Sequence, residues 1–207
     1  MAGLLGYIAT FLGSSNFNVA EGKPLLPWQT LWVSFTMLSI QSVGLGYSKP
    51  AAGLMDRPPL PPSRPILTRG ILLWLALIGL LMAVGTLSVI SWADQAHGPA
   101  IARTMGMVTF ALFLPFFSIE CKDERDSAFS LDTFSDKTFR IATSGSFLLL
   151  VLSTVLGIFQ TVLKTVRLGV VQWLICTAVA LSVVVAAEIR KAVLRRTAVP
   201  PGMQVSR

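Results

Sequence analysis

Residues 24–69 read PLLPWQTLWVSFTMLSIQSVGLGYSKPAAGLMDRPPLPPSRPILTR, and this stretch decides the fold. Its first half, Trp28–Tyr47, is long and apolar enough to cross a bilayer, because about 20 helical residues span the roughly 30 Å hydrocarbon core. Trp28 and Trp32 lie at one end and Tyr47 at the other, where amphipathic rings prefer the headgroup region. The second half is rich in proline and arginine. The stretch therefore predicts a transmembrane helix followed by a cytoplasmic loop.

The composition of the whole chain agrees with a membrane protein. Of the 207 residues, 53% are hydrophobic and 13% are charged, with a mean hydropathy of +0.69. A net charge of +7 could indicate a nucleic-acid partner. The basic residues lie between apolar segments, however, so we expect the lipid bilayer and no nucleic acid as a partner. Lipid admits only helices or closed barrels, and these runs are too long for barrel strands, so we predict an all-α integral membrane protein.

Five apolar runs have the length of a full transmembrane helix, and one N-terminal run is shorter. The five runs are Trp28–Tyr47, Ile71–Ala93, Thr104–Ile119, Ile141–Val162 and Val170–Ala187. The third is short, and Pro115 should kink it. Residues 1–12 cover only half a bilayer and predict a partial hydrophobic helix. Residues 13–187 then form the transmembrane domain, and residues 188–207 form a basic cytoplasmic tail.

The distribution of charge predicts how the bundle is oriented. If the five runs cross the membrane in turn, 13 of the 17 Lys and Arg residues lie on one side and 4 on the other. Basic residues concentrate on the cytoplasmic side of membrane proteins. We therefore expect a multi-pass protein of the plasma or inner membrane, with His97 external and the C-terminus cytoplasmic.

Three segments carry a resemblance to a known family. They read MDRPPLPPSRPILTR at 55–69, RTMGMVTFALFLPFFSIECKDERDSAF at 103–129 and VRLGVVQWLICTAVALSVVVAAEIRKAVLRR at 166–196. They resemble the loop after the sixth helix, the eighth helix and the tenth helix of calcium-pump-like P-type cation-transporting ATPases. The resemblance implies that the chain corresponds to the C-terminal transmembrane domain, from the end of the family's fifth helix to the end of its tenth.

The family phosphorylates an aspartate in a DKTGT motif of a large cytosolic domain, and this sequence contains no such motif. Residues 136–138 read DKT, but Phe139 follows in place of glycine, so we interpret the segment as a charged cytoplasmic loop. We expect no enzyme activity from this chain on its own and no cofactor.

The resemblance also places ion ligands on the first full span. The family's sixth helix supplies oxygens through N-x-x-T-D, as hard cations such as Ca²⁺ require. The matching positions are Ser34, Met37 and Leu38, so the carboxylate is absent. Ser34, Thr36 and Gln41 remain weak candidate metal ligands. Neutral side chains of this kind on a membrane helix more often bond to neighbouring helices.

Glu120 and Glu124 are the remaining weak candidates for a metal site. Carboxylates within a membrane are functional candidates by default, because burying them is costly. Glu124 matches a polar position at the exit of the family's eighth helix, but charged residues surround it, which favours a solvated loop. Glu120 lies deeper. His97 stands beside Gly98 in an external loop, and we expect it on the surface.

These observations favour a non-enzymatic membrane module that resembles the C-terminal half of a P-type pump, either a split-pump subunit or a truncated or remnant pump. Its partner would be the catalytic part of a P-type ATPase. An autonomous small ion channel or transporter stays open, and so does a regulatory partner of an intact pump. The lack of charged residues inside the five spans counts against a channel. Small-residue pairs at Ala142/Ser146 and Ser153/Gly157 predict close-packing helix faces.

Overall fold

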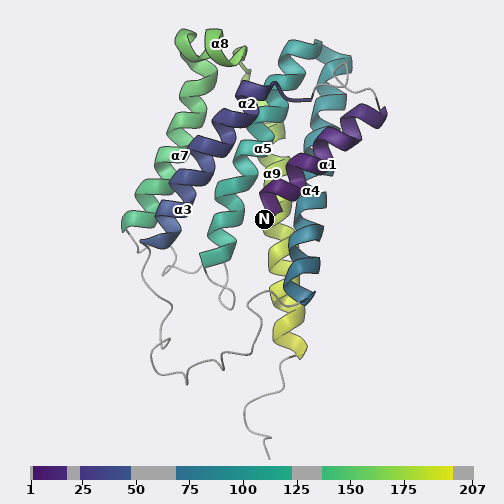
Figure 1. Ribbon diagram of the computed structural model, residues 1–207, viewed down its shortest axis with the longest axis vertical. Coiled ribbons are helices and arrows are strands. Elements are labelled where there is room, and N and C mark those ends of the chain that lie inside the picture. The colour runs from purple at the N-terminus through teal and green to yellow at the C-terminus, as the bar shows by residue number, and fades with distance from the viewer. Residues whose placement is uncertain (1, 18–23, 48–68, 123–136, 198–207) are drawn as a thin grey trace, which may run out of the picture.

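The computed structural model describes residues 2–17, 24–47, 69–122 and 137–197, and these ranges are largely helical (Figure 1). None of them contains a strand, so the all-α prediction is confirmed. The helices are α1 (Ala2–Phe17), α2 (Pro27–Trp32), the π-helix η2 (Val33–Leu38), α3 (Ser39–Gly46), α4 (Arg69–His97), α5 (Pro99–Lys122), α7 (Lys137–Val155), α8 (Gly157–Leu163) and α9 (Val170–Thr197).

Within the described residues, four single helices are long and apolar enough to cross a membrane: α4, α5, α7 and α9. The span predicted at Trp28–Tyr47 is made instead of α2, η2 and α3, which follow one another without a gap. The count of five full spans therefore differs from the structure, because one span is a composite. Its central six residues, Val33–Leu38, form π-type turns. Such turns are rare in proteins, and where they occur they are often at functional sites.

The predicted span Ile141–Val162 is wrong at its C-terminal end. Helix α7 ends at Val155, Leu156 is extended, and the short helix α8 then lies across one end of the bundle (Figure 1). The amide Nε2 of Gln160 donates to the carbonyl oxygen of Thr154 at 2.7 Å, which satisfies one of the carbonyls that the break exposes. Hydropathy could not predict this break, because α8 is as apolar as α7 and the apolar run continues through both.

Two further boundaries differ from the predictions. Helix α1 continues to Phe17, beyond the expected end at residue 12. Helix α5 begins at Pro99 rather than Thr104. Gly98 ends α4 in the left-handed region at φ 84°, and Pro99 starts α5 with a ring that needs no backbone donor. This short turn makes α4 and α5 an antiparallel hairpin.

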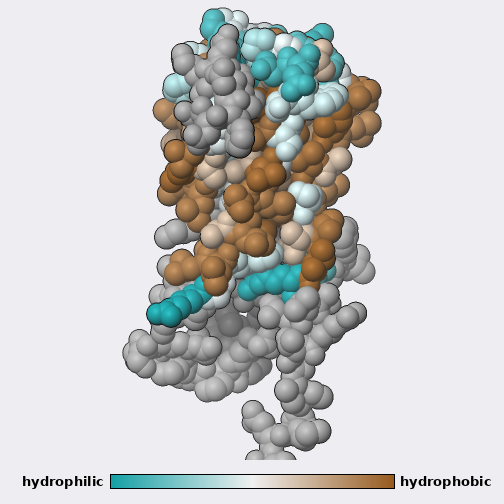
Figure 2. Space-filling model, turned by 90° about the vertical axis from the view of Figure 1, so that its right-hand side faces the viewer, coloured by the Kyte–Doolittle hydropathy of each residue, from teal (hydrophilic) through white to brown (hydrophobic). Residues whose placement is uncertain are grey.

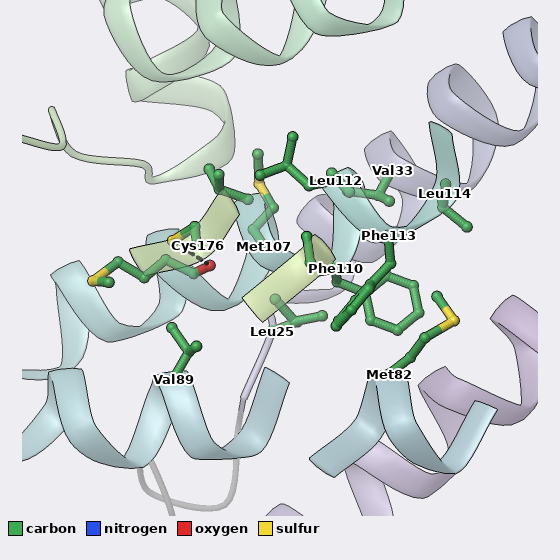
Figure 3. Packing of buried hydrophobic residues seen from close by; sticks show 14 of the residues in the cluster. Leu25, Val33, Met82, Val89, Met107, Phe110, Leu112, Phe113, Leu114 and Cys176 are labelled. Carbon is green, nitrogen blue, oxygen red and sulfur yellow. Dashed lines mark hydrogen bonds between the residues drawn. The ribbon is translucent and has the colours of Figure 1, made fainter. Parts of the chain in front are cut away.

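Helix α5 lies at the centre of the bundle. In the most apolar stretch of α5, 72% is buried inside the protein. The corresponding share is 22–33% in the other three candidate spans. Phe110 and Phe113 are wholly buried and lie near Met82 of α4 (Figure 3). The ring of Tyr7 on α1 lies 4.0 Å from that of Phe110. The predicted span Thr104–Ile119, the shortest of the five, is thus surrounded by protein. The helices around it provide the surface that contacts lipid. The helix continues through Pro115, and the predicted kink there stays a prediction.

The outer helices present large apolar side chains to the surroundings. Figure 2 shows a hydrophobic belt between two more hydrophilic ends. Exposed members of this belt include Leu73, Leu77, Leu148, Leu174, Val171 and Val185. Such a surface is unfavourable in water and matches lipid chains. With four membrane-length apolar helices, the belt supports a multi-pass membrane protein.

Candidate functional site

The π-helix η2 contains the positions that the resemblance assigns to ion ligands. Ser34 and Thr36 are half-buried there. Met37 is 0% exposed and belongs to the hydrophobic core, whereas Leu38 is 39% exposed. A buried thioether and a partly exposed hydrocarbon thus stand where the family would place two oxygen ligands. Neither group suits a hard divalent cation.

The neutral candidate oxygens are directed to different neighbours. Ser34 faces the Tyr7 hydroxyl of α1, although the geometry does not form a hydrogen bond. Gln41, two turns further along the chain, donates its Nε2 to Ser146 Oγ of α7 at 3.0 Å. The interpretation that these polar groups bond to neighbouring helices is confirmed for Gln41. Ser34 and Gln41 therefore do not converge on one point in this structure.

The contact between α3 and α7 is close because small residues meet there. Ser146 donates its hydroxyl to the Ala142 carbonyl at 3.0 Å while accepting from Gln41. A Cβ placed on Gly44 would lie 2.6 Å from the Ala142 Cβ. The predicted Ala142/Ser146 packing face is confirmed. The Ser153/Gly157 face is wrong, because Gly157 lies beyond the end of α7 with open space around it.

The buried oxygen atoms of this contact are not all satisfied. Among the described residues, Gln41 Oε1 and Thr143 Oγ1 have no hydrogen-bond partner although both atoms are buried. Thr143 lies one turn before Ser146 on α7. An unpaired buried polar group lowers stability, so this contact is less stable than a fully paired one.

The acidic candidates stay predictions. Glu120 lies on the α5 backbone, but its side chain is outside the described part of the chain, as is the whole of Glu124. His97 is the last residue of α4, exposed, with its ring 5.6 Å from that of Trp92. The residues that the structure describes contain no group of three His, Cys, Asp or Glu able to hold a metal ion. Asp136 also lies outside the described residues.

Sequence reasoning missed the polar ties at the opposite end of the bundle. Gln29 is buried, accepts from the Leu26 amide at 3.0 Å and donates to the Leu163 carbonyl at 2.9 Å. It therefore joins the start of α2 to the end of α8. Thr104 accepts from the Val166 amide at 3.1 Å. One feature of the sequence could have indicated this contact: Gln29 lies in the first turn of an apolar run. The backbone groups at helix ends lack partners within the helix, and an amide side chain can supply them.

Residues 22–193 match the protein family described as "Cation transporting ATPase, C-terminus". The chain belongs to this family. It is 31% identical over 176 residues to calcium-transporting ATPase 1 of Schizosaccharomyces pombe, which is 84% of this chain and 20% of that protein. It is 26% identical over 173 residues to the probable cation-transporting ATPase F of Mycobacterium bovis, covering 82% and 19%. A mouse calcium-transporting ATPase type 2C member 2 is 26% identical over 171 residues, covering 82% and 18%.

This member of the cation-transporting ATPase C-terminal family thus spans about a fifth of the length of the curated relatives that it matches. The matched region begins after α1 and contains every other described helix, with α9 included as far as residue 193. Helix α1 nevertheless packs along α4 and stacks Tyr7 on Phe110, so it is an integral part of the folded unit.

Proposed function

We propose that this chain works as the C-terminal membrane module of a P-type cation pump and performs no ATP chemistry itself. The observation that carries the proposal is the match over residues 22–193, which runs through a single packed bundle and corresponds to one fifth of cation-transporting ATPases. Phosphorylation and nucleotide binding then belong to a catalytic region outside these 207 residues, on the same or on another polypeptide.

Within such a pump, this module supplies a packed frame and neutral oxygens rather than the charged ion ligands. On η2, Met37 is buried in the core and Leu38 offers hydrocarbon. Ser34 and Thr36 contribute hydroxyls only. Dehydrating a divalent cation needs nearby negative charge, so the carboxylates of the transport site would come from the rest of the pump, with Glu120 and Glu124 as the candidates on this chain.

Phosphoenzyme labelling tests the proposal. The tagged chain is purified in mild detergent from its native membranes and incubated with radiolabelled ATP and Ca²⁺. We expect hydroxylamine-labile phosphate on a P-type catalytic sequence that is recovered with residues 1–207 and none on those residues. Asp136→Asn serves as the matched control and should leave the labelling unchanged. Loss of the label in this variant, or recovery without any catalytic sequence, would contradict the proposal.

Calcium binding tests the assignment of ligands. The chain purified alone should show no heat of Ca²⁺ binding at micromolar concentrations, since Ser34 and Thr36 bring no negative charge. The control is the same titration after addition of the co-purified catalytic region. Micromolar binding by the chain alone that Glu120→Gln abolishes, together with Ca²⁺ flux into liposomes, would favour an autonomous transporter instead.

A further inference from the structure

The bundle has a basic end, defined here as the end at which α4 and α7 begin and α9 finishes (Figure 1). The basic side chains described there are Arg69, Lys137, Arg140, Arg190 and Lys191, and the one acid described among them is Glu188. Lys191 lies 3.7 Å from Glu188 and is largely buried. Among the described side chains, the positive charge exposed at this end therefore belongs mainly to arginines.

Arg190 has an unusual setting at the basic end. Its guanidinium carbon lies 4.7 Å from the centroid of the Trp74 ring, so α9 and α4 meet through a cation–π contact. Within the described part of the chain, the Trp74 ring is the partner of Arg190, and the guanidinium N–H groups donate no hydrogen bond there. The contact places the guanidinium beside the Trp74 ring. The planar fork of N–H donors in a guanidinium suits two-pronged binding of a phosphate.

The beginning of α4 adds to the positive potential. Arg69 is its first residue and is exposed, and its first turn contains no acidic residue. Trp74 follows five residues later, which is about 7.5 Å along the helix axis at 1.5 Å per residue. The positive end of the helix dipole therefore lies on the same side of the bundle as the guanidinium of Arg190.

Aliphatic side chains lead from this position into the hydrophobic belt. Leu73 and Leu77 are exposed one and two turns into α4 from Arg69, and Val185 and Ile189 are exposed one turn apart on α9. Leu73 is 72% exposed and Ile189 60%. A phosphate-binding edge that continues into an open hydrocarbon surface complements an amphiphile whose head is anionic.

We propose that the α4–α9 edge binds an anionic phospholipid. Its phosphate lies at Arg190 and Arg69, and an acyl chain lies along Leu73 and Ile189. Charge complementarity favours an anionic head over a zwitterionic one, because the side chains described at this end are five basic residues and one acid, Glu188, which is paired with Lys191. The site does not depend on whether the chain belongs to a pump.

Native mass spectrometry of the full chain in detergent tests this site. The protein is titrated with phosphatidylglycerol or with phosphatidylcholine of identical acyl chains. We expect tighter binding of phosphatidylglycerol, and Arg190→Gln should weaken it about fivefold, the effect of one basic residue at a membrane surface. Arg190→Lys should have an intermediate effect, since it keeps the charge and loses the two-pronged contact. Arg167→Gln is the matched control, because Arg167 is an exposed arginine at the opposite end.

Several results would overturn the proposal. These are equal binding of the two lipids, unchanged phosphatidylglycerol binding by Arg190→Gln, or an equal loss in Arg167→Gln. Displacement of the lipid by millimolar inorganic phosphate would assign the site to a soluble anion instead. If Arg190→Gln does not yield a monodisperse protein, the variants Arg190→Lys and Arg69→Gln replace it. Weaker phosphatidylglycerol binding in both variants supports the site, and unchanged binding in both refutes it.

Discussion

Replacing Gly44 by alanine should loosen the contact between α3 and α7. The new Cβ would lie 2.6 Å from the Ala142 Cβ, whereas carbon atoms pack at about 3.5–4.0 Å, so the helices must separate by roughly 1 Å. Overpacking of this kind costs about 1–3 kcal/mol. Separation also stretches the Gln41–Ser146 hydrogen bond, worth about 0.6 kcal/mol in a membrane protein. The better helix propensity of alanine offsets about 1 kcal/mol, which leaves a net loss of about 0.6–2.6 kcal/mol.

The assay is unfolding by sodium dodecyl sulfate in mixed micelles, followed by circular dichroism. Gly46→Ala is the matched control on the same helix, because nothing lies within 4 Å of a Cβ there, and it should not destabilise the protein. Adding Ala142→Gly to Gly44→Ala should restore most of the lost stability. Equal stability of the Gly44 and Gly46 variants, or no rescue by Ala142→Gly, would refute the close approach of the two helices.

Three further predictions concern other polar contacts and the orientation. Ser146→Ala should lower the free energy of unfolding by about 0.6–1.7 kcal/mol, because it removes the hydrogen bond to Gln41. Gln41→Leu should lower it by less, because this variant also removes the unpaired Oε1 atom. The same unfolding assay measures both variants. Gln29→Leu should cost about 2 kcal/mol in that assay, because it leaves two backbone groups without partners. A reporter active only in the cytoplasm should be active when fused after Arg207 and silent near His97; the opposite pattern would invert the orientation.

Length and hydropathy predicted where the membrane-crossing helices lie but not how each one is built. The run Trp28–Tyr47 is continuous in hydropathy, so nothing in it marks the π-type turns of Val33–Leu38, which depend on what packs around them. The break at Leu156 was equally invisible, because hydropathy does not distinguish a helix that crosses lipid from one that lies across the end of a bundle. Gly98 and Pro99, by contrast, mark a helix boundary that was readable from the sequence.

The geometry of the candidate site could not be predicted from the sequence. The absence of a carboxylate at Leu38 is what the family resemblance implies for that position, and it stays a prediction. The directions of Ser34 and Gln41 depend on the rotation of the composite span against α1 and α7, which single-sequence patterns do not encode. Arg190 and Trp74 are far apart in the chain, and only the packing of α9 against α4 brings them together.

The central position of α5 has a consequence for biosynthesis. This helix leaves the ribosome before α7 and α9, yet its inward side carries Thr104, Thr109 and Ser118, which are buried in the finished bundle. Until the segments after α5 arrive, Thr104 lacks the Val166 amide from which it accepts a hydrogen bond. The short turn at Gly98 ties α5 to the strongly apolar α4, so the two enter the membrane as a hairpin in which α4 provides the anchoring surface. Insertion of the central helix therefore depends on the helix that precedes it, and its final packing depends on the helix that follows last.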